Sequence, residues 1–95
     1  MKSTFIVVAY DVVCDRRRLH LARYLATYGI RINLSVFECC IPVAEVPPFK
    51  AKAVSFIDRA TDTVVFYTLC LNCIACIDRV GLGARQADPS VVTTA

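Results

Sequence analysis

The residues best suited to chemistry lie close together near the start of the chain. Asp11 ends an apolar run, and Arg16, Arg17 and Arg18 follow it within seven residues. Carboxylates commonly hold magnesium beside a phosphate in phosphoryl chemistry, with several waters retained on the ion. The planar guanidinium group of arginine forms paired hydrogen bonds to phosphate. This spacing therefore predicts a phosphate site and makes Asp11 a candidate magnesium ligand.

Both assignments have alternatives when the residues are considered alone. A loop aspartate commonly accepts hydrogen bonds from backbone N–H groups, and from composition alone this is the simpler explanation of Asp11. The arginines would then form a solvated basic turn whose charge Asp15 compensates. Against this, three cations in the first turn of a helix oppose its macrodipole, and such a broken rule suggests a functional site. A two-fold dimer would also bring a second Asp11, if the two strand ends meet at the axis.

The six cysteines are a second group that could carry chemistry, and three recur every third residue at Cys70, Cys73 and Cys76. Structural zinc sites usually pair two short motifs that are well separated in the sequence, so this spacing is poor for zinc. A packed stripe along one helix is the simpler explanation. A fourth zinc ligand would come from Cys14, His20, Cys39 or Cys40. Cys14 and His20 would also make a nucleophile pair, but nothing in the sequence activates either residue.

The composition indicates one folded domain with more apolar surface than it can bury alone. Of the 95 residues, 57% are hydrophobic and 20% are charged, and the mean hydropathy is +0.56. These values exclude a disordered chain. A domain of this size buries only about 60–65% of its unfolded surface. A membrane, a large ligand or a second subunit must therefore cover the remainder.

A membrane is the least suitable of these covers. The longest uncharged run, residues 63–77, has fifteen residues, whereas a spanning helix needs about 20 apolar residues. No small-residue cleavage site follows the first apolar run, so a signal peptide is not expected. We therefore expect a cytoplasmic protein with reduced thiols, without a membrane attachment and with a protein partner.

Hydrophobic patterns predict the order of the helices and strands. Residues 5–10 form a β-branched run typical of a buried strand. Asp15 is a suitable N-cap for a helix from Arg16, with Leu19, Ala22, Leu25 and Ala26 as its buried stripe. The predicted elements that follow are an alternating strand over 30–36, an extended continuation over 37–41, a helix from about Pro47, a strand over 63–69, a short helix over 72–80 and a terminal strand over 90–93.

This order, strand–helix–two strands–helix–strand, predicts an α+β fold of the ferredoxin-like βαββαβ type. Two helices would cover one face of an antiparallel sheet, and the other face would stay open for the surplus apolar surface. We expect residues 1–80 to form the domain and residues 81–95 to form a C-terminal segment whose short extra strand docks on a partner subunit.

The basic charge is concentrated in the first third of the chain. Residues 1–31 contain six basic and two acidic side chains, whereas the remainder contains five basic and six acidic ones. This distribution favours a polyanion partner at the arginine cluster. Arginine–phosphate contacts position a nucleic acid without reading its sequence.

Together, these motifs resemble those of CRISPR-associated protein 2, the small subunit of the machinery that acquires CRISPR spacers. The resemblance covers residues 3–70. Its elements are Tyr10-Asp11 at the end of the first strand, Asp15-Arg16-Arg17-Arg18 at the start of a helix, and the run from Tyr28-Gly29 through Arg31 to Ser35-Val36-Phe37-Glu38.

The resemblance implies a homodimer that binds double-stranded DNA, or RNA, and bridges dimers of the integrase CRISPR-associated protein 1. It also implies a magnesium-dependent endonuclease in antiviral defence, with Asp11 as metal ligand and catalytic residue. Arg16, Arg17, Arg18 and Arg31 are the candidate contacts to nucleic acid, and the supporting positions near the site or the dimer interface are Tyr10, Ser35 and Phe37.

Two alternatives to this function stay open. In the first, the dimer is a DNA-binding bridge without catalysis, because no histidine or second acid lies at a helpful spacing to act as a general base. In the second, the chain is a toxin-type ribonuclease of the same fold. The sequence also departs from the family, since Pro47-Pro48 shortens the second helix and the cysteines from Cys39 to Cys76 are unusual.

Overall fold

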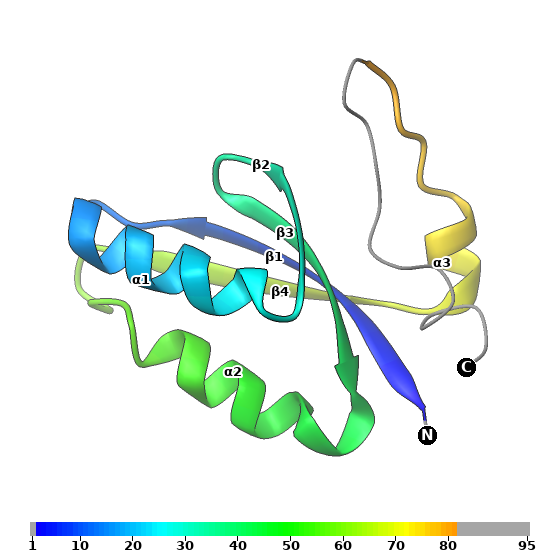
Figure 1. Cartoon of the computed structure of the whole chain (residues 1–95), viewed down its shortest axis with the longest axis horizontal. Coiled ribbons are helices and arrows are strands. Elements are labelled where there is room, and N and C mark those ends of the chain that lie inside the picture. The colour runs from blue at the N-terminus through cyan, green and yellow to red at the C-terminus, as the bar shows by residue number, and fades with distance from the viewer. Residues whose placement is uncertain (1, 82–95) are drawn as a thin grey trace.

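A four-stranded antiparallel sheet forms the centre of the protein. In the computed structural model, which describes residues 2–81, strand β1 (Ser3–Asp11) runs through the middle of the sheet. It pairs with β3 (Val36–Pro42) on one side and with β4 (Thr63–Leu69) on the other, and β2 (Gly29–Asn33) pairs with β3. The strand order is therefore β2-β3-β1-β4 (Figure 1).

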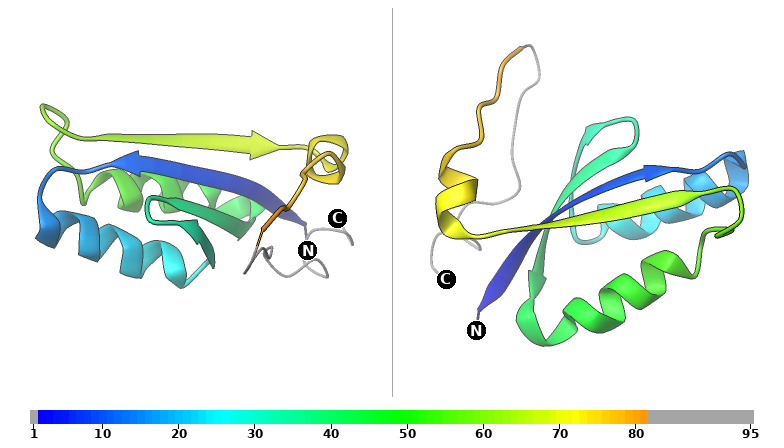
Figure 2. Two further views of the ribbon diagram at one scale, coloured as in Figure 1. Left: turned by 90° about the horizontal axis from the view of Figure 1, so that it is seen from above. Right: turned by 180° about the vertical axis from the view of Figure 1, so that it is seen from behind.

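Two helices cover one face of this sheet. They are α1 (Asp15–Ala26) and α2 (Val46–Val54), and both lie on the same side (Figure 2). A short 3₁₀ helix, Val43–Glu45, leads into α2, and a third helix, α3 (Leu71–Ala75), directly follows β4. This arrangement confirms the predicted ferredoxin-like α+β fold.

Alternation along β1 places every second side chain in the core between sheet and helices. Ile6, Val8 and Tyr10 point into this core, and each is at most 5% exposed. Phe49 of α2 packs in the same core, with its ring centroid 5.0 to 6.1 Å from those of Tyr24, Tyr28 and Phe66. The aromatic cluster fixes α2 against α1 and β4, and so holds the helix layer in place.

Among the described residues, 2–81, only those after β4 cover the opposite face of the sheet, called the open face below, and they cover one end of it. Phe5 is 3% exposed because Ile74 and Ile77, from α3 and the residue run after it, pack against it. Arg79 then forms two hydrogen bonds to Glu38 of β3, at 2.8 and 2.7 Å, and both side chains are largely buried. Residues 71–79 are thereby fastened to the open face.

The remainder of the open face keeps exposed apolar side chains. Val65 and Tyr67 of β4 lie opposite Ala9 and Val7 of β1, and they are 42% and 53% exposed. Within residues 2–81 this uncovered apolar area agrees with the excess of hydrophobic residues in the composition.

Helix α1 differs from the sequence prediction in its first residue and in its buried side. Its N-cap is Cys14 and not Asp15, which is the first helical residue. Leu21 is buried with Ala22 and Leu25, whereas Leu19 is 48% exposed. The predicted stripe was off centre, because Leu21 and Leu25, four residues apart, lie in the middle of the buried face.

Other differences concern the later elements. A turn at Leu34 and Ser35 separates β2 from β3, where the sequence suggested one extended stretch. Helix α3 ends at Ala75, well before residue 80. The predicted strand over 90–93 lies outside the described residues. No helix among residues 2–81 is long and apolar enough to cross a membrane.

Candidate nucleic-acid and metal site

Asp11 is the last residue of the central strand β1, and its side chain is exposed. Because side chains alternate along a strand, it lies on the open face, whereas the preceding Tyr10 is buried under the helices. Its partner across the ladder is Thr63 of β4. In the part of the chain that the structure describes, the Asp11 carboxylate makes no hydrogen bond or ion pair. Its oxygens are therefore available to a ligand.

Tyr10 holds the end of β1 in place from the face of the sheet that the helices cover. Its hydroxyl donates to the carbonyl oxygen of Leu34 at 3.2 Å, and its backbone N–H donates to the carbonyl of Ser35 at 3.0 Å. Its ring stacks on Phe37 with 6.3 Å between centroids. Burial raises the pKa of Tyr10, against the opposing charge of Arg31. The hydroxyl therefore stays protonated and serves as a donor at neutral pH.

Arg31 holds the turn between β2 and β3 at the same place. Its Nε and Nη2 atoms donate to the carbonyl of Leu34 at 3.3 and 2.7 Å. The guanidinium carbon lies 5.7 Å from the ring centroid of Phe37, within the range of a cation–π contact. Tyr10, Arg31, Phe37 and the backbone of Ser35 therefore come together, in contacts that position the strand end next to Asp11.

Arg17 is engaged by a residue far away in the sequence. Its Nε and Nη2 atoms donate to the two carboxylate oxygens of Asp62, at 3.0 and 3.2 Å. The Asp62 side chain is completely buried, while that of Arg17 is 32% exposed. Part of the Arg17 side chain is still exposed to solvent, but its guanidinium is mainly occupied by the ion pair with Asp62, which stabilises the fold.

Asp62 is the positioning residue that sequence reasoning missed. Its carboxylate also accepts hydrogen bonds from the backbone N–H of Val13 at 3.1 Å, from the N–H of Asp58 at 2.9 Å and from the Thr61 hydroxyl at 3.0 Å. The Arg17 guanidinium, followed by these donors, holds the pKa of Asp62 well below its usual range. Through Val13, Asp62 holds the loop that joins Asp11 to α1.

The side chains of the other two arginines of the cluster differ in their hydrogen bonds and ion pairs. Arg18 donates to the carbonyl of Val12 at 2.6 Å and forms an ion pair with Asp15. Arg16 is exposed and makes no side-chain hydrogen bond or ion pair within residues 2–81. Arg16 is thus the arginine of the cluster best placed for a phosphate, with Arg18 beside the loop that follows Asp11.

Asp11 and the arginines share one end of the molecule, where β1 ends and α1 begins (Figure 1). The carboxylate lies on the open face, however, and Arg17, Arg18 and Arg31 contact the loops on the helix side. A nucleic acid that touched both would have to pass around this end of the sheet.

A single carboxylate fits the way in which magnesium is bound, although it does not make a complete site. Mg²⁺ is usually held by one or two carboxylates together with waters and substrate phosphates. Among the described residues no three His, Cys, Asp or Glu side chains group so as to hold a metal ion. Asp11 supplies hard oxygen donors of the right kind, and the others would come from water, phosphate or a second copy. The same finding leaves Cys70, Cys73 and Cys76 without a zinc set.

Cys14 and His20 do not form a nucleophile pair in the described structure, since no hydrogen bond joins them. Backbone N–H groups of Arg17 and Arg16 lower the pKa of the Cys14 thiol, and His20 is exposed on α1.

Comparison with known proteins places these features in a family. The family described as CRISPR associated protein Cas2 matches residues 4–76. The chain is 35% identical over 83 residues to a protein from Rhodospirillum rubrum named CRISPR-associated endoribonuclease Cas2 4, with 87% of this chain and 65% of the relative covered. It is also 35% identical over 80 residues to a Cas2 endoribonuclease from Chloroflexus aurantiacus, with 83% and 86% covered.

Solved structures agree with the sequence comparison. The crystal structure of Streptococcus pyogenes Cas2 superposes with a TM-score of 0.71 at 33% identity, over 81% of this chain and 99% of that one. The family match over residues 4–76 spans nearly all of β1, both long helices and β4, and so includes Asp11 and the arginine cluster. The chain therefore belongs to the CRISPR associated protein Cas2 family, as its motifs predicted.

Proposed function

We propose that this chain serves CRISPR spacer acquisition as a homodimer that binds double-stranded nucleic acid and hydrolyses phosphodiester bonds with magnesium at Asp11. The observation that carries the proposal is the Asp11 carboxylate, exposed and unpaired within residues 2–81 at the end of the central strand of a Cas2 chain. The relatives from Rhodospirillum and Chloroflexus carry the name endoribonuclease, which supports the nuclease part.

The open face supports the homodimer. Val65 and Tyr67 are exposed there on the same side of the sheet as Asp11. A two-fold interface uses the same surface of both chains, so open faces packed together would cover this apolar area and bring the two Asp11 side chains toward each other. In the proposed assembly each chain then contributes one carboxylate to a shared site.

In this proposal Asp11 would hold the magnesium ion. The bound ion would polarise the phosphodiester and lower the pKa of a water molecule. Arg16 would bind a phosphate of the backbone, with Arg18 beside it. Arg17 acts through Asp62, which holds the loop after Asp11, and Tyr10 and Arg31 hold the strand end. As part of the same proposal, the homodimer bridges CRISPR-associated protein 1.

The test is magnesium-dependent cleavage by the Asp11→Asn variant. This change keeps the side-chain size and removes the charge that would bind the ion, so cleavage of single-stranded RNA and of duplex DNA should be lost while duplex binding is kept. Asp78→Asn is the matched control, because Asp78 is also an exposed aspartate but lies beyond α3. Cleavage by Asp11→Asn at the wild-type rate would refute the catalytic role, and a monomeric mass in solution would refute the dimer.

The second candidate is a DNA-binding bridge without catalysis. It is favoured by the incomplete ligand set at the site, since within residues 2–81 no three His, Cys, Asp or Glu side chains group around Asp11 so as to hold a metal ion. Duplex binding by a wild-type chain that cleaves neither RNA nor DNA would support it.

A further inference from the structure

Two cysteines that take no part in the proposed function lie in contact at the start of α3. Cys70 follows β4 directly and is the N-cap of α3, and Cys73 lies within the helix. Their sulfur atoms are 3.4 Å apart, and both residues are exposed. A disulfide needs about 2.05 Å between sulfurs, so side-chain adjustments of about 1.4 Å would join them.

The pair lies at the opposite end of the sheet from Asp11. In the ladder between β1 and β4, Phe5 is paired with Leu69, the residue before Cys70, whereas Asp11 is paired with Thr63. A redox reaction at these cysteines would therefore leave the Asp11 carboxylate chemically unchanged, and the two sites can be tested separately.

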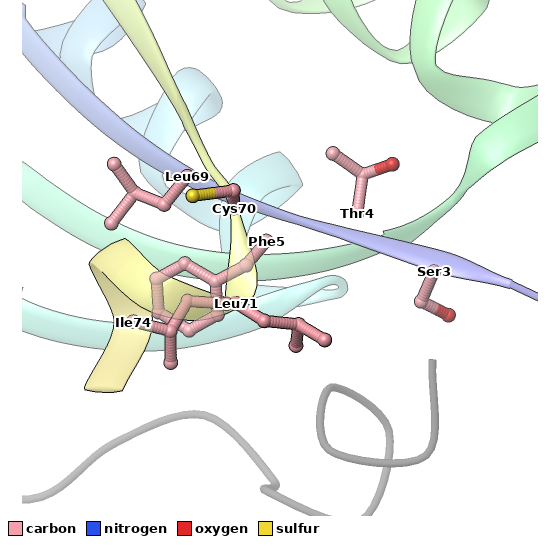
Figure 3. Close-up of a pocket in the computed structure, with 7 residues that line it drawn as sticks. All are labelled: Ser3, Thr4, Phe5, Leu69, Cys70, Leu71 and Ile74. Atoms are coloured by element: carbon pink, nitrogen blue, oxygen red, sulfur yellow. The ribbon is translucent and has the colours of Figure 1, made fainter.

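Cys70 is exposed and is one of the residues that line a pocket of about 190 Å³. Figure 3 shows its walls, with the ring of Phe5 and the branched side chains of Leu71 and Ile74 below Cys70 in this view and the hydroxyl groups of Ser3 and Thr4 to one side.

The two thiols differ in acidity. The backbone amide of Cys73, followed by its thiol, lowers the pKa of Cys70. The neighbouring Cys70 thiol raises the pKa of Cys73. A thiolate is the attacking form in disulfide exchange, so these directions, at sulfurs in contact, favour Cys70 as the attacking thiol and Cys73 as the resolving thiol.

We propose that Cys70 and Cys73 form a dithiol site that exchanges with low-molecular-weight disulfides, such as glutathione disulfide, to give an intrachain disulfide. The Cys70 thiolate attacks one sulfur of the small disulfide, forms a mixed disulfide and releases one thiolate. The Cys73 thiolate then attacks the Cys70 sulfur and releases the second. The two protein thiols are oxidised, the small disulfide is reduced to two thiols, and the protons of Cys70 and Cys73 end on those thiols.

The disulfide would restrict the segment that packs on the open face. Ile74 and Ile77, just after the pair, pack on Phe5. Linking Cys70 to Cys73 closes the first turn of α3 and restricts the chain between β4 and these contacts. Oxidation should therefore restrict the first turn of α3, directly before these contacts.

The test uses the full chain, purified with a reductant and a chelator and then equilibrated without air in glutathione buffers of increasing disulfide content. Samples are quenched with acid, alkylated and analysed by intact mass and peptide mapping. The wild type should lose two alkylatable thiols together, with a link between Cys70 and Cys73. In Cys73→Ser the reaction should stop at a glutathione adduct on Cys70.

Cys76→Ser is the matched control, because Cys76 is an exposed cysteine of the same segment that the proposal does not use. It should form the same link at the same buffer composition as the wild type. A link from Cys73 to Cys76, a link between chains, or an adduct that persists on wild-type Cys70 would each overturn the proposal. So would loss of the link in Cys76→Ser. Circular dichroism of each variant is the check that the substitution has not unfolded the chain.

Discussion

Gly29 begins β2 where this edge strand lies against β3, and replacing it is a direct test of that packing. A Cβ atom at residue 29 would lie 2.0 Å from the carbonyl oxygen of Glu38 and 2.7 Å from Cα of Cys39. Ordinary contacts begin at 3.4 Å, so Gly29→Ala requires the strands to separate by about 1.4 Å at this point. Both obstructing atoms are backbone atoms, and no side-chain rotation relieves the clash.

The expected loss of stability follows from this overlap. Overpacking that shifts the backbone costs about 1–3 kcal/mol. Alanine also restricts the unfolded chain, which returns about 0.4–1 kcal/mol. Adding partial loss of ladder hydrogen bonds, at about 0.5–1.5 kcal/mol each, we expect the free energy of unfolding to fall by about 2 kcal/mol. For a domain of this size that corresponds to a decrease in Tm of about 8–16 °C.

Thermal unfolding followed by circular dichroism measures this change. Gly81→Ala is the comparison, because nothing lies within 4 Å of a Cβ there and only the positive φ of 110° opposes it. Its effect on Tm should be the smaller of the two. A Gly29→Ala chain that melts at or above the wild-type temperature would refute the close approach of β2 to β3.

Two further predictions concern charge. Asp62 has a lower pKa folded than unfolded, so its stabilising contribution is complete above the unfolded pKa of about 4 and is lost as the pH falls below it. The urea midpoint should therefore drop as the pH falls from about 5 to about 2, and Arg17→Gln should make this drop smaller; equal drops in both chains would contradict the pairing. Arg16→Ala should weaken duplex binding equally for all sequences and reduce the slope of log K against log salt by about one unit. An unchanged slope would remove Arg16 from the phosphate contacts.

Several features of the fold were predictable because they depend on local pattern. The β-branched run before Asp11 marks a buried strand, and Pro47 and Pro48 occupy the first turn of α2 as expected. The βαββαβ order then leaves few topologies, so the ferredoxin-like fold followed. The turn at Leu34 and the short α3 were not predictable in this way, because no glycine or proline marks their boundaries.

The candidate site also has features that local sequence predicts and features that depend on tertiary contacts. The sequence by itself determined that a carboxylate ends the first strand and that arginines begin the next helix, since both are statements about neighbours in the chain. Only the tertiary structure decided that Arg17 forms an ion pair with Asp62, 45 residues away, and that Arg16 is the exposed member of the cluster. It also decided that Asp11 lies on the open face while Tyr10 lies in the core. The physical reason is that such pairings, and the choice of which strand face the helices cover, arise from packing between distant segments, which local pattern does not encode.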